Sequence, residues 1–213
     1  MKIRFLSITL ACSMIAAACS DLVETSPVFC DGELVFNASM GDDTKTSLQS
    51  DGSIMWNASE NINMFYGNSV SAVFTSSNTE PAATTSFSGS FGTFEQNSDD
   101  WFYAVYPYRQ ENSCNDDLLH VTLPQKQEAV AGGFANNLFI SVAKTRDRNL
   151  VFRNVCGGVK FSLTHEGIKQ VILEANGGES LAGVASVTIG DDGIPAAQTA
   201  ENQGSTIILN APF

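Results

Sequence analysis

The sequence predicts an all-β protein, and three observations support this fold class. From Glu33 onwards an apolar repeat of 3.6 residues is almost absent. Segments in which apolar and polar residues alternate recur instead, about every 8 to 15 residues. Between them lie short stretches rich in Gly, Asn, Asp and Ser, which favour turns. Short strands at this spacing indicate a sandwich or a barrel, and we expect β-sandwich domains.

The first set of predicted strands defines an expected N-terminal domain of residues 33–149. Its first segment alternates Leu34 and Phe36 with polar neighbours. Pro107 and Pro124 end two later segments, because proline cannot donate a hydrogen bond to a strand ladder. The predicted strands of this set lie in residues 33–39, 44–49, 53–57, 61–67, 69–77, 84–91, 101–108, 118–123 and 138–145.

A charged turn at residues 145–149 precedes a second set, which defines an expected C-terminal domain of residues 150–213. A two-sheet domain usually takes about seven strands. Only about five are predicted here, so we expect this second domain to be incomplete. The predicted strands of the second set lie in residues 150–155, 158–164, 169–176, 183–190 and 205–213.

The N-terminus has the parts of an export signal. The basic segment Met1–Arg4 precedes an uncharged run of about 14 residues, which is too short to span a bilayer as a helix. Three alanines then supply the small side chains that a signal peptidase requires, and Cys19 follows them. This order is typical of a bacterial lipoprotein signal, in which the thiol receives a lipid. We expect a signal peptide at 1–18 and a tether at 19–32, and a plain secretory signal cut near Ala18 is the alternative.

The composition of the chain excludes several classes of partner. The formal net charge is −12, and the 11 Lys and Arg residues are scattered. Nucleic-acid binding requires a basic surface, and the same charge disfavours binding to anionic lipid. We therefore expect no nucleic-acid partner and no membrane contact except through the N-terminal lipid. No zinc-type Cys/His spacing and no phosphate-loop pattern occurs, so we expect no metal and no cofactor.

Three cysteines follow Cys19 in the chain. Cys156 lies in an apolar, strand-like segment, so we expect it to be a buried free thiol. Cys30 and Cys114 both lie in turn-like sequence. In an oxidising compartment a disulfide between them is the alternative to two free thiols.

No pattern of catalytic residues is present, and we expect a protein that is not an enzyme. His120 lies in a predicted strand and His165 in a turn, where structural or surface roles are expected. The acidic pair Asp191 and Asp192 is interpreted as part of a hairpin turn, because calcium requires six to eight oxygen ligands from a shaped loop. A carboxylate pair for glycoside hydrolysis stays open, because the separation of such a pair is spatial and not sequential.

The aromatic residues offer an alternative function. They could form a platform on a sheet face that stacks against sugars, as in a glycan-binding surface lipoprotein. Packing in a core is the interpretation that we favour, because the strand around residues 101–106 is apolar on both faces. The residues concerned are Trp56, Trp101, Tyr103, Tyr106 and Tyr108.

Several marks in a fixed order resemble the fimbrillin family, the lipoprotein pilus subunits of Gram-negative gut and oral anaerobes. They are a Thr-Lys-Thr strand, the stretch "IMWNASENINMFYG", the strand "WFYAVYPY", the segment "VTLPQKQEA", the strand "VFRNV" and the turn "NGGESLAG". The match covers roughly residues 40–185 and lies behind the lipoprotein signal.

The resemblance implies two successive β-sandwich domains of Greek-key, transthyretin-like topology, on a lipoprotein that is exported to the surface of the outer membrane. In the family, a surface protease removes the N-terminal segment together with the first strand. The C-terminal strand of a neighbouring subunit then fills the groove that is left. The implied partners are other fimbrial subunits through donor-strand exchange, host or bacterial surface ligands, and the membrane through the lipid.

Two features depart from the family pattern. Maturation in the family typically uses an arginine-specific protease, but no Arg lies between Arg4 and Arg109. Lys45 is the only basic residue in that interval and is therefore the predicted position for maturation. A subunit that is not cut would keep its lipid and act as an anchor, a terminating subunit or a non-polymerising relative. The chain also ends at Phe213, earlier than family members, so we expect the donor strand proper to be missing.

Overall fold

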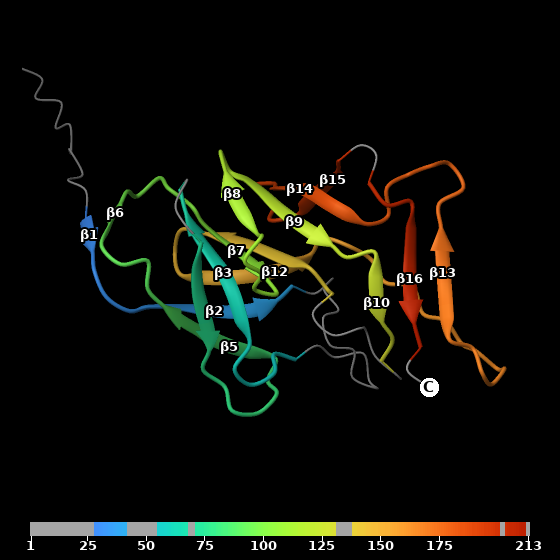
Figure 1. Ribbon diagram of the computed structural model, residues 1–213. Helices are drawn as coiled ribbons and strands as arrows, with labels where there is room; N and C mark the ends of the chain where they lie inside the picture. The colour runs from blue at the N-terminus through green and yellow to red at the C-terminus, as the bar shows by residue number, and fades with distance from the viewer. Residues whose placement is uncertain (1–27, 42–54, 68–70, 131–137, 201–202, 212–213) are drawn as a thin grey trace, which may run out of the picture.

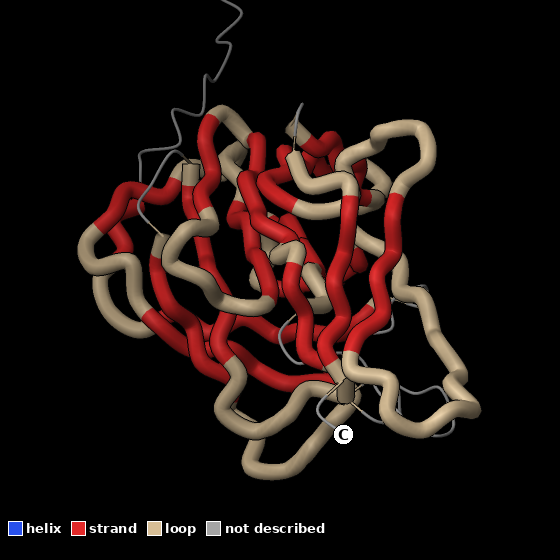
Figure 2. Tube along the Cα trace, turned by 45° about the vertical axis from the view of Figure 1, so that its right-hand side comes forward, coloured by secondary structure: helices blue, strands red, loops and turns tan. Residues whose placement is uncertain are grey.

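The computed structural model describes residues 28–41, 55–67, 71–130, 138–200 and 203–211. Within these ranges the chain forms sixteen strands and no helix, which confirms the all-β prediction (Figure 1, Figure 2). No helical segment of the described ranges has the length and hydropathy needed to span a bilayer. The predicted signal peptide at 1–18, Cys19 and Lys45 all lie outside the described residues.

Seven strands pair side by side into a closed barrel, which we call the ring. Six of its neighbour pairs are antiparallel, whereas β12 runs parallel to β2 and so closes the ring. In order around the ring the strands are β11 (Ser141–Thr145), β12 (Asn149–Asn154), β2 (Leu34–Met40), β5 (Thr84–Gly89), β4 (Ala72–Ser76), β3 (Asn61–Tyr66) and β7 (Phe102–Tyr106).

The interior of the ring is filled mainly by aromatic side chains. Because side chains alternate across a strand, one side of each strand supplies this first core. Trp56 lies at its centre, with its ring about 5 Å from those of Phe87, Tyr106 and Phe152 in edge-on contacts. The buried residues of the first core are Phe36, Ala38, Trp56, Ile62, Met64, Tyr66, Phe74, Phe87, Phe102, Ala104, Ala143, Leu150 and Phe152.

A four-stranded sheet covers one side of the ring and creates a second core. Its order is β15 (Pro195–Thr199), β14 (Gly183–Ile189), β9 (Leu118–Leu123) and β8 (Ser113–Asn115). Outward side chains of β3, β7 and β11 pack against it, namely Phe65, Tyr103, Val105 and Val142. The buried residues of the second core are Phe65, Tyr103, Val105, Cys114, Leu119, Val121, Ile140, Val142, Ala185, Val187 and Ile189.

Two smaller sheets lie outside these cores. A three-stranded sheet, which we call the C-terminal sheet, has the order β10 (Lys126–Glu128), β16 (Thr206–Asn210) and β13 (Gln170–Glu174). It lies beside the ring at the end of the molecule that is on the right in Figure 1. A two-stranded ribbon joins β1 (Val28–Cys30), within the predicted tether, to β6 (Phe94–Gln96).

The strand pairing differs from the expected arrangement in three places. The predicted boundary between residues 149 and 150 falls inside β12, and both neighbours of β12 in the ring precede residue 150. Hydrogen bonding thus joins β12 to the first set of strands, and the division into two domains stays a prediction. The Greek-key sandwich is not confirmed by this pairing. The segment 158–164, predicted as a strand from its alternation, forms none.

Candidate functional site

Among the described strands, the two outer strands of the C-terminal sheet each have one edge without a partner. β13 pairs with β16 over five residue pairs, from Gln170 opposite Asn210 to Glu174 opposite Thr206. β10 runs parallel to β16 over three pairs. Within the described ranges no further strand pairs with the outer edge of β13 or of β10. An unpaired edge presents a row of N–H and C=O groups that can receive another strand.

Two strands of this sheet, β13 and β16, are apolar at their centres but are not buried. Not one residue of β10, β13 or β16 is buried, although β16 carries Ile207, Ile208 and Leu209. Ile172 on β13 is 58% exposed. The neighbouring segment 158–164 behaves in the same way, because its alternating apolar side chains stay exposed. They are Val159 at 63%, Phe161 at 41% and Leu163 at 48%. These segments therefore have the apolar side chains that are typical of buried strands, but no described layer of the protein packs over them.

The ribbon of β1 and β6 is the described part of the chain nearest to the predicted lipid anchor. It consists of three residue pairs, and Phe29 is 70% exposed on it. Gln96 ties the ribbon to the ring, since its Oε1 accepts a hydrogen bond from Arg148 Nη2 at 3.1 Å. The Cys30 thiol donates to the same oxygen at 3.4 Å. β1 is thus attached by few contacts.

The five aromatic residues do not gather into a surface platform. Trp56 and Tyr103 are 0% and 3% exposed in the first and second cores, which confirms the core interpretation for both. The Tyr106 hydroxyl donates to Glu60 Oε1 at 2.8 Å, and burial raises its pKa. Trp101 is half-buried under Lys144 and Arg146, which lie 4.6 and 4.1 Å from its ring centre. Tyr108 is the most exposed of the five, at 37%.

The three described cysteines are all free thiols, so the alternative disulfide between Cys30 and Cys114 is not formed. Cys114 is 3% exposed in the second core. Burial raises the pKa of its thiol to about 12, and the nearby Asp117 carboxylate adds to the rise. Cys156 is a free thiol as predicted, but it is half-buried and not fully buried. Burial also raises the pKa of Cys156.

The two histidines and the acidic pair Asp191 and Asp192 make local contacts within strands and turns. His120 on β9 has its Nδ1 3.3 Å from Ser186 Oγ, whereas His165 is exposed beside Thr164. The described residues contain no group of three or more His, Cys, Asp or Glu side chains that could hold a metal ion. Asp192 caps the turn between β14 and β15 by accepting a hydrogen bond from the Ile194 amide at 2.9 Å. The hairpin-turn interpretation of this acidic pair is therefore confirmed.

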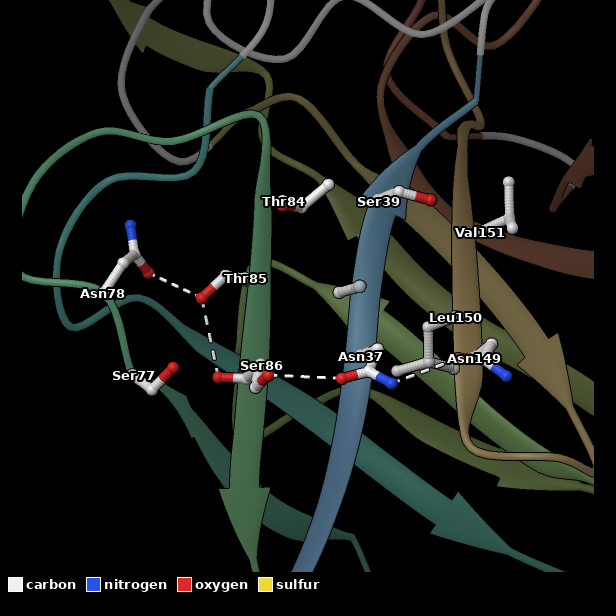
Figure 3. Close-up of a pocket in the computed structure, with 11 residues that line it drawn as sticks. Asn37, Ser39, Ser77, Asn78, Thr84, Thr85, Ser86, Asn149, Leu150 and Val151 are labelled. Carbon is white, nitrogen blue, oxygen red and sulfur yellow. Dashed lines mark hydrogen bonds between the residues drawn. The ribbon is translucent and has the colours of Figure 1, made fainter.

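A polar groove lies on the outer face of the ring over β5, β2 and β12, and it has a volume of about 440 Å³ (Figure 3). We call it the polar groove. No sequence pattern pointed to it, because its side chains come from strands that are far apart in the chain. The lining residues are Asn37, Ala38, Ser39, Ser77, Asn78, Thr84, Thr85, Ser86, Asn149, Leu150 and Val151.

A chain of hydrogen bonds crosses the polar groove. Asn37 is at its centre: its Oδ1 accepts from Ser86 Oγ at 3.3 Å, and its Nδ2 donates to Asn149 Oδ1 at 3.2 Å. At one side Thr85 Oγ1 donates to Asn78 Oδ1 at 2.7 Å. These bonds hold the amide of Asn37 in one orientation, while the side chain itself remains exposed.

The molecule thus offers two candidate surfaces: the open C-terminal sheet, which suits a strand, and the polar groove, which suits a polar ligand. Comparison of the chain with protein-family models, with curated proteins and with solved structures gave no match.

Proposed function

We propose that this protein is a surface-anchored, fimbrillin-like lipoprotein that acts as a structural or adhesive pilus subunit, or as the anchor of a pilus, and that assembles by β-strand exchange. Its localisation would be the outer membrane, with a lipid on Cys19 as the anchor. The two transthyretin-like Greek-key sandwiches of the fimbrillin family belong to the same proposal. The observation that carries it is the C-terminal sheet, whose edges are unpaired and whose apolar side chains are half exposed.

The physical reason is that a donated strand would both pair with the free backbone groups of the sheet edge and bury apolar side chains that are now exposed. Backbone hydrogen bonds along β13 would give binding strength, and alternate side chains of the donor would cover the apolar face. Burial of a side chain such as that of Ile172, which is 58% exposed, contributes about 1.5–3 kcal/mol when it is complete. β13 and β16 also carry Leu173, Ile207 and Leu209, none of which is buried, so an added strand could remove further apolar area from water.

Strand exchange at the C-terminal sheet is tested with the purified chain that lacks only the predicted signal peptide, residues 1–18, so that β2 stays in the ring. We expect this chain to form ladders on gels, or to bind a synthetic peptide with the sequence of residues 205–213. Ile172→Asn should abolish both effects. Val35→Asn is the matched control, because Val35 is 51% exposed on β2, away from the C-terminal sheet. A chain that stays monomeric and binds no peptide would contradict strand exchange.

The lipid anchor is tested separately in cells that are supplied with a labelled fatty acid. We expect the label to enter the wild-type protein and to be absent from Cys19→Ala. Cys12→Ala is the control, because Cys12 lies inside the apolar run and should not affect labelling. Label that persists in Cys19→Ala would contradict the anchor.

A glycan-binding surface lipoprotein is the alternative function. The aromatic platform that motivated it is not supported by the burial of Trp56 and Tyr103. Any glycan site on the described surface must therefore use other side chains.

A further inference from the structure

We propose that the polar groove over β5, β2 and β12 is a binding site for a neutral oligosaccharide, recognised by amide and hydroxyl groups and not by aromatic stacking. This inference does not rest on strand exchange, because the groove belongs to the ring and not to the C-terminal sheet.

The first argument is the difference between the two halves of the ring surface. On β3, β7 and β11 the outward side chains of Phe65, Tyr103 and Val142 are buried under the four-stranded sheet. On β5, β2 and β12 the outward side chains remain uncovered, and those in the groove are almost all neutral and polar. Exposed strand faces normally carry many Lys, Glu, Asp and Arg side chains. This chain has 34 such residues, 11 basic and 23 acidic, and yet none of the described residues lining the groove is charged.

The second argument is the regular arrangement of these side chains in two rows. Strand pairing places Ser86 and Asn149 opposite Asn37, on either side of it. Two residues further along, Thr84 and Val151 lie opposite Ser39 in the same way. Figure 3 shows both rows crossing the three strands. Neighbouring strands are about 4.8 Å apart, so each row extends over about 10 Å.

The third argument is the chemistry that these rows can recognise. An Asn amide has two N–H donors and a carbonyl acceptor, and a hydroxyl both donates and accepts. Asn37 uses one donor on Asn149 and accepts from Ser86, so a second N–H is left for a ligand on a side chain that is already oriented. Sugar hydroxyls likewise donate and accept. The side chain of Val151, 48% exposed at the end of the second row, offers an apolar contact for the C–H face of a sugar ring.

Other classes of ligand fit the groove poorly. An anion would meet no basic side chain among the described lining residues, on a protein with a net charge of −12. A cation would find no carboxylate there. A wholly apolar ligand would take the amides of Asn37 and Asn149 out of water without replacing their hydrogen bonds, which is unfavourable. A neutral ligand with many hydroxyl groups is the class that remains.

The test is binding of the purified chain to an array of neutral, sialylated and sulfated glycans, followed by NMR titration with the best neutral oligosaccharide. We expect the neutral glycans to be preferred. Asn37→Ala should weaken the affinity about tenfold, the effect of losing one or two hydrogen bonds. Ser39→Val, which removes a hydroxyl at a half-buried strand position where Val is well tolerated, should weaken binding without loss of folding.

The matched control is Asn61→Ala. Asn61 also lies on the ring and accepts a cross-strand hydrogen bond from Thr75 at 2.8 Å, but it does not line the groove. Its substitution should leave glycan affinity unchanged. Thermal unfolding of each variant separates loss of binding from loss of fold. The proposal is overturned if no neutral glycan binds at millimolar concentration, if acidic glycans are preferred, or if Asn37→Ala and Ser39→Val bind as well as Asn61→Ala.

Discussion

The ring and the C-terminal sheet are built from the same kind of sequence and differ in what covers them. In the ring, Phe36 and Phe152 lie on the inward faces of β2 and β12 and are 0% exposed. In the C-terminal sheet, Ile172 lies between Val171 and Leu173 on β13 and is 58% exposed. The ring closes on itself and is covered on one side by a second sheet, whereas the C-terminal sheet has three strands and no buried residue. An apolar strand sequence therefore allows a segment to form a strand, and a second layer determines whether its apolar side chains stabilise the protein.

The sharpest test of this difference compares two phenylalanines. Phe36→Ala should lower the free energy of unfolding by about 3–5 kcal/mol, because it leaves a cavity between rings in the first core. Phe29→Ala, at a side chain that is 70% exposed, should change it by less than about 1 kcal/mol. Urea denaturation measures both. Equal losses would mean that the ribbon of β1 and β6 is part of the stable core.

The second core is tested in the same way with two leucines. Leu119 is 0% exposed and Leu163 is 48% exposed. We expect Leu119→Ala to lower the free energy of unfolding by about 2–4 kcal/mol, and Leu163→Ala to lower it by less than about 1 kcal/mol. If the four-stranded sheet and the ring form one cooperative unit, fluorescence and circular dichroism will report the same midpoint for Leu119→Ala. Two separate transitions would show that the second core unfolds by itself.

Alkaline pH should weaken the cores in a predictable direction. Burial raises the pKa of Cys114 from 9.0 to about 12 and, first among its causes, that of Tyr66 from 10.0 to about 12. A raised pKa in the folded state gives stability that is present below the unfolded value and is lost as pH rises towards the folded value. Stability should therefore fall as the pH rises from about 9 to 12.

The variant Cys114→Ala isolates the contribution of this thiol to the pH dependence of the free energy of unfolding. We expect the free energy of unfolding of this variant to fall less steeply than that of the wild type between pH 9 and 11, although it is lower at pH 7 because volume is lost from the core. Chemical denaturation at four or five pH values measures the slope. Identical slopes would mean that the thiol already ionises in the folded protein.

The smallest expected effect comes from the C-terminal sheet itself. Ile172→Thr keeps a β-branched side chain on β13, and it should change the free energy of unfolding by no more than about 0.5 kcal/mol. Ile62→Thr makes the same change on β3, where the side chain is 0% exposed, and should cost several times as much, since it buries an extra hydroxyl. A large loss of unfolding free energy for Ile172→Thr in the monomer would mean that another segment of the same chain already packs over this face of β13.

The sequence allowed the strands and part of the core to be predicted. Residues 101–106 are apolar at every position, and the structure gives the reason, because β7 has Phe102 in the first core and Tyr103 in the second. The alternation at residues 158–164 predicted a strand that is not formed, since a period of two residues requires a partner strand and does not supply one. The same limit applies to β12, whose parallel pairing with β2 has no local signal.

The polar groove could not be predicted for a related reason. Its central residues Asn37 and Asn149 are 112 positions apart, and Asn37 and Ser86 are 49 apart. A sequence shows only that each lies at an outward position of its own strand. Strand order and register are what bring them into one row, and both follow from non-local packing. The lipid anchor and the maturation position lie outside the described residues, so they stay predictions.

The parallel contact between β12 and β2 has a consequence for how the chain is made. Asn37 meets Asn149 across this contact, so β2 must wait for 112 more residues before its last neighbour exists. At about 5–20 residues per second, a ribosome needs roughly 6–22 seconds for that length. During this interval the ring cannot close around the aromatic side chains of the first core, and the nascent polypeptide leaves them accessible to chaperones. The ring therefore cannot close before residues 149–152 have left the ribosome.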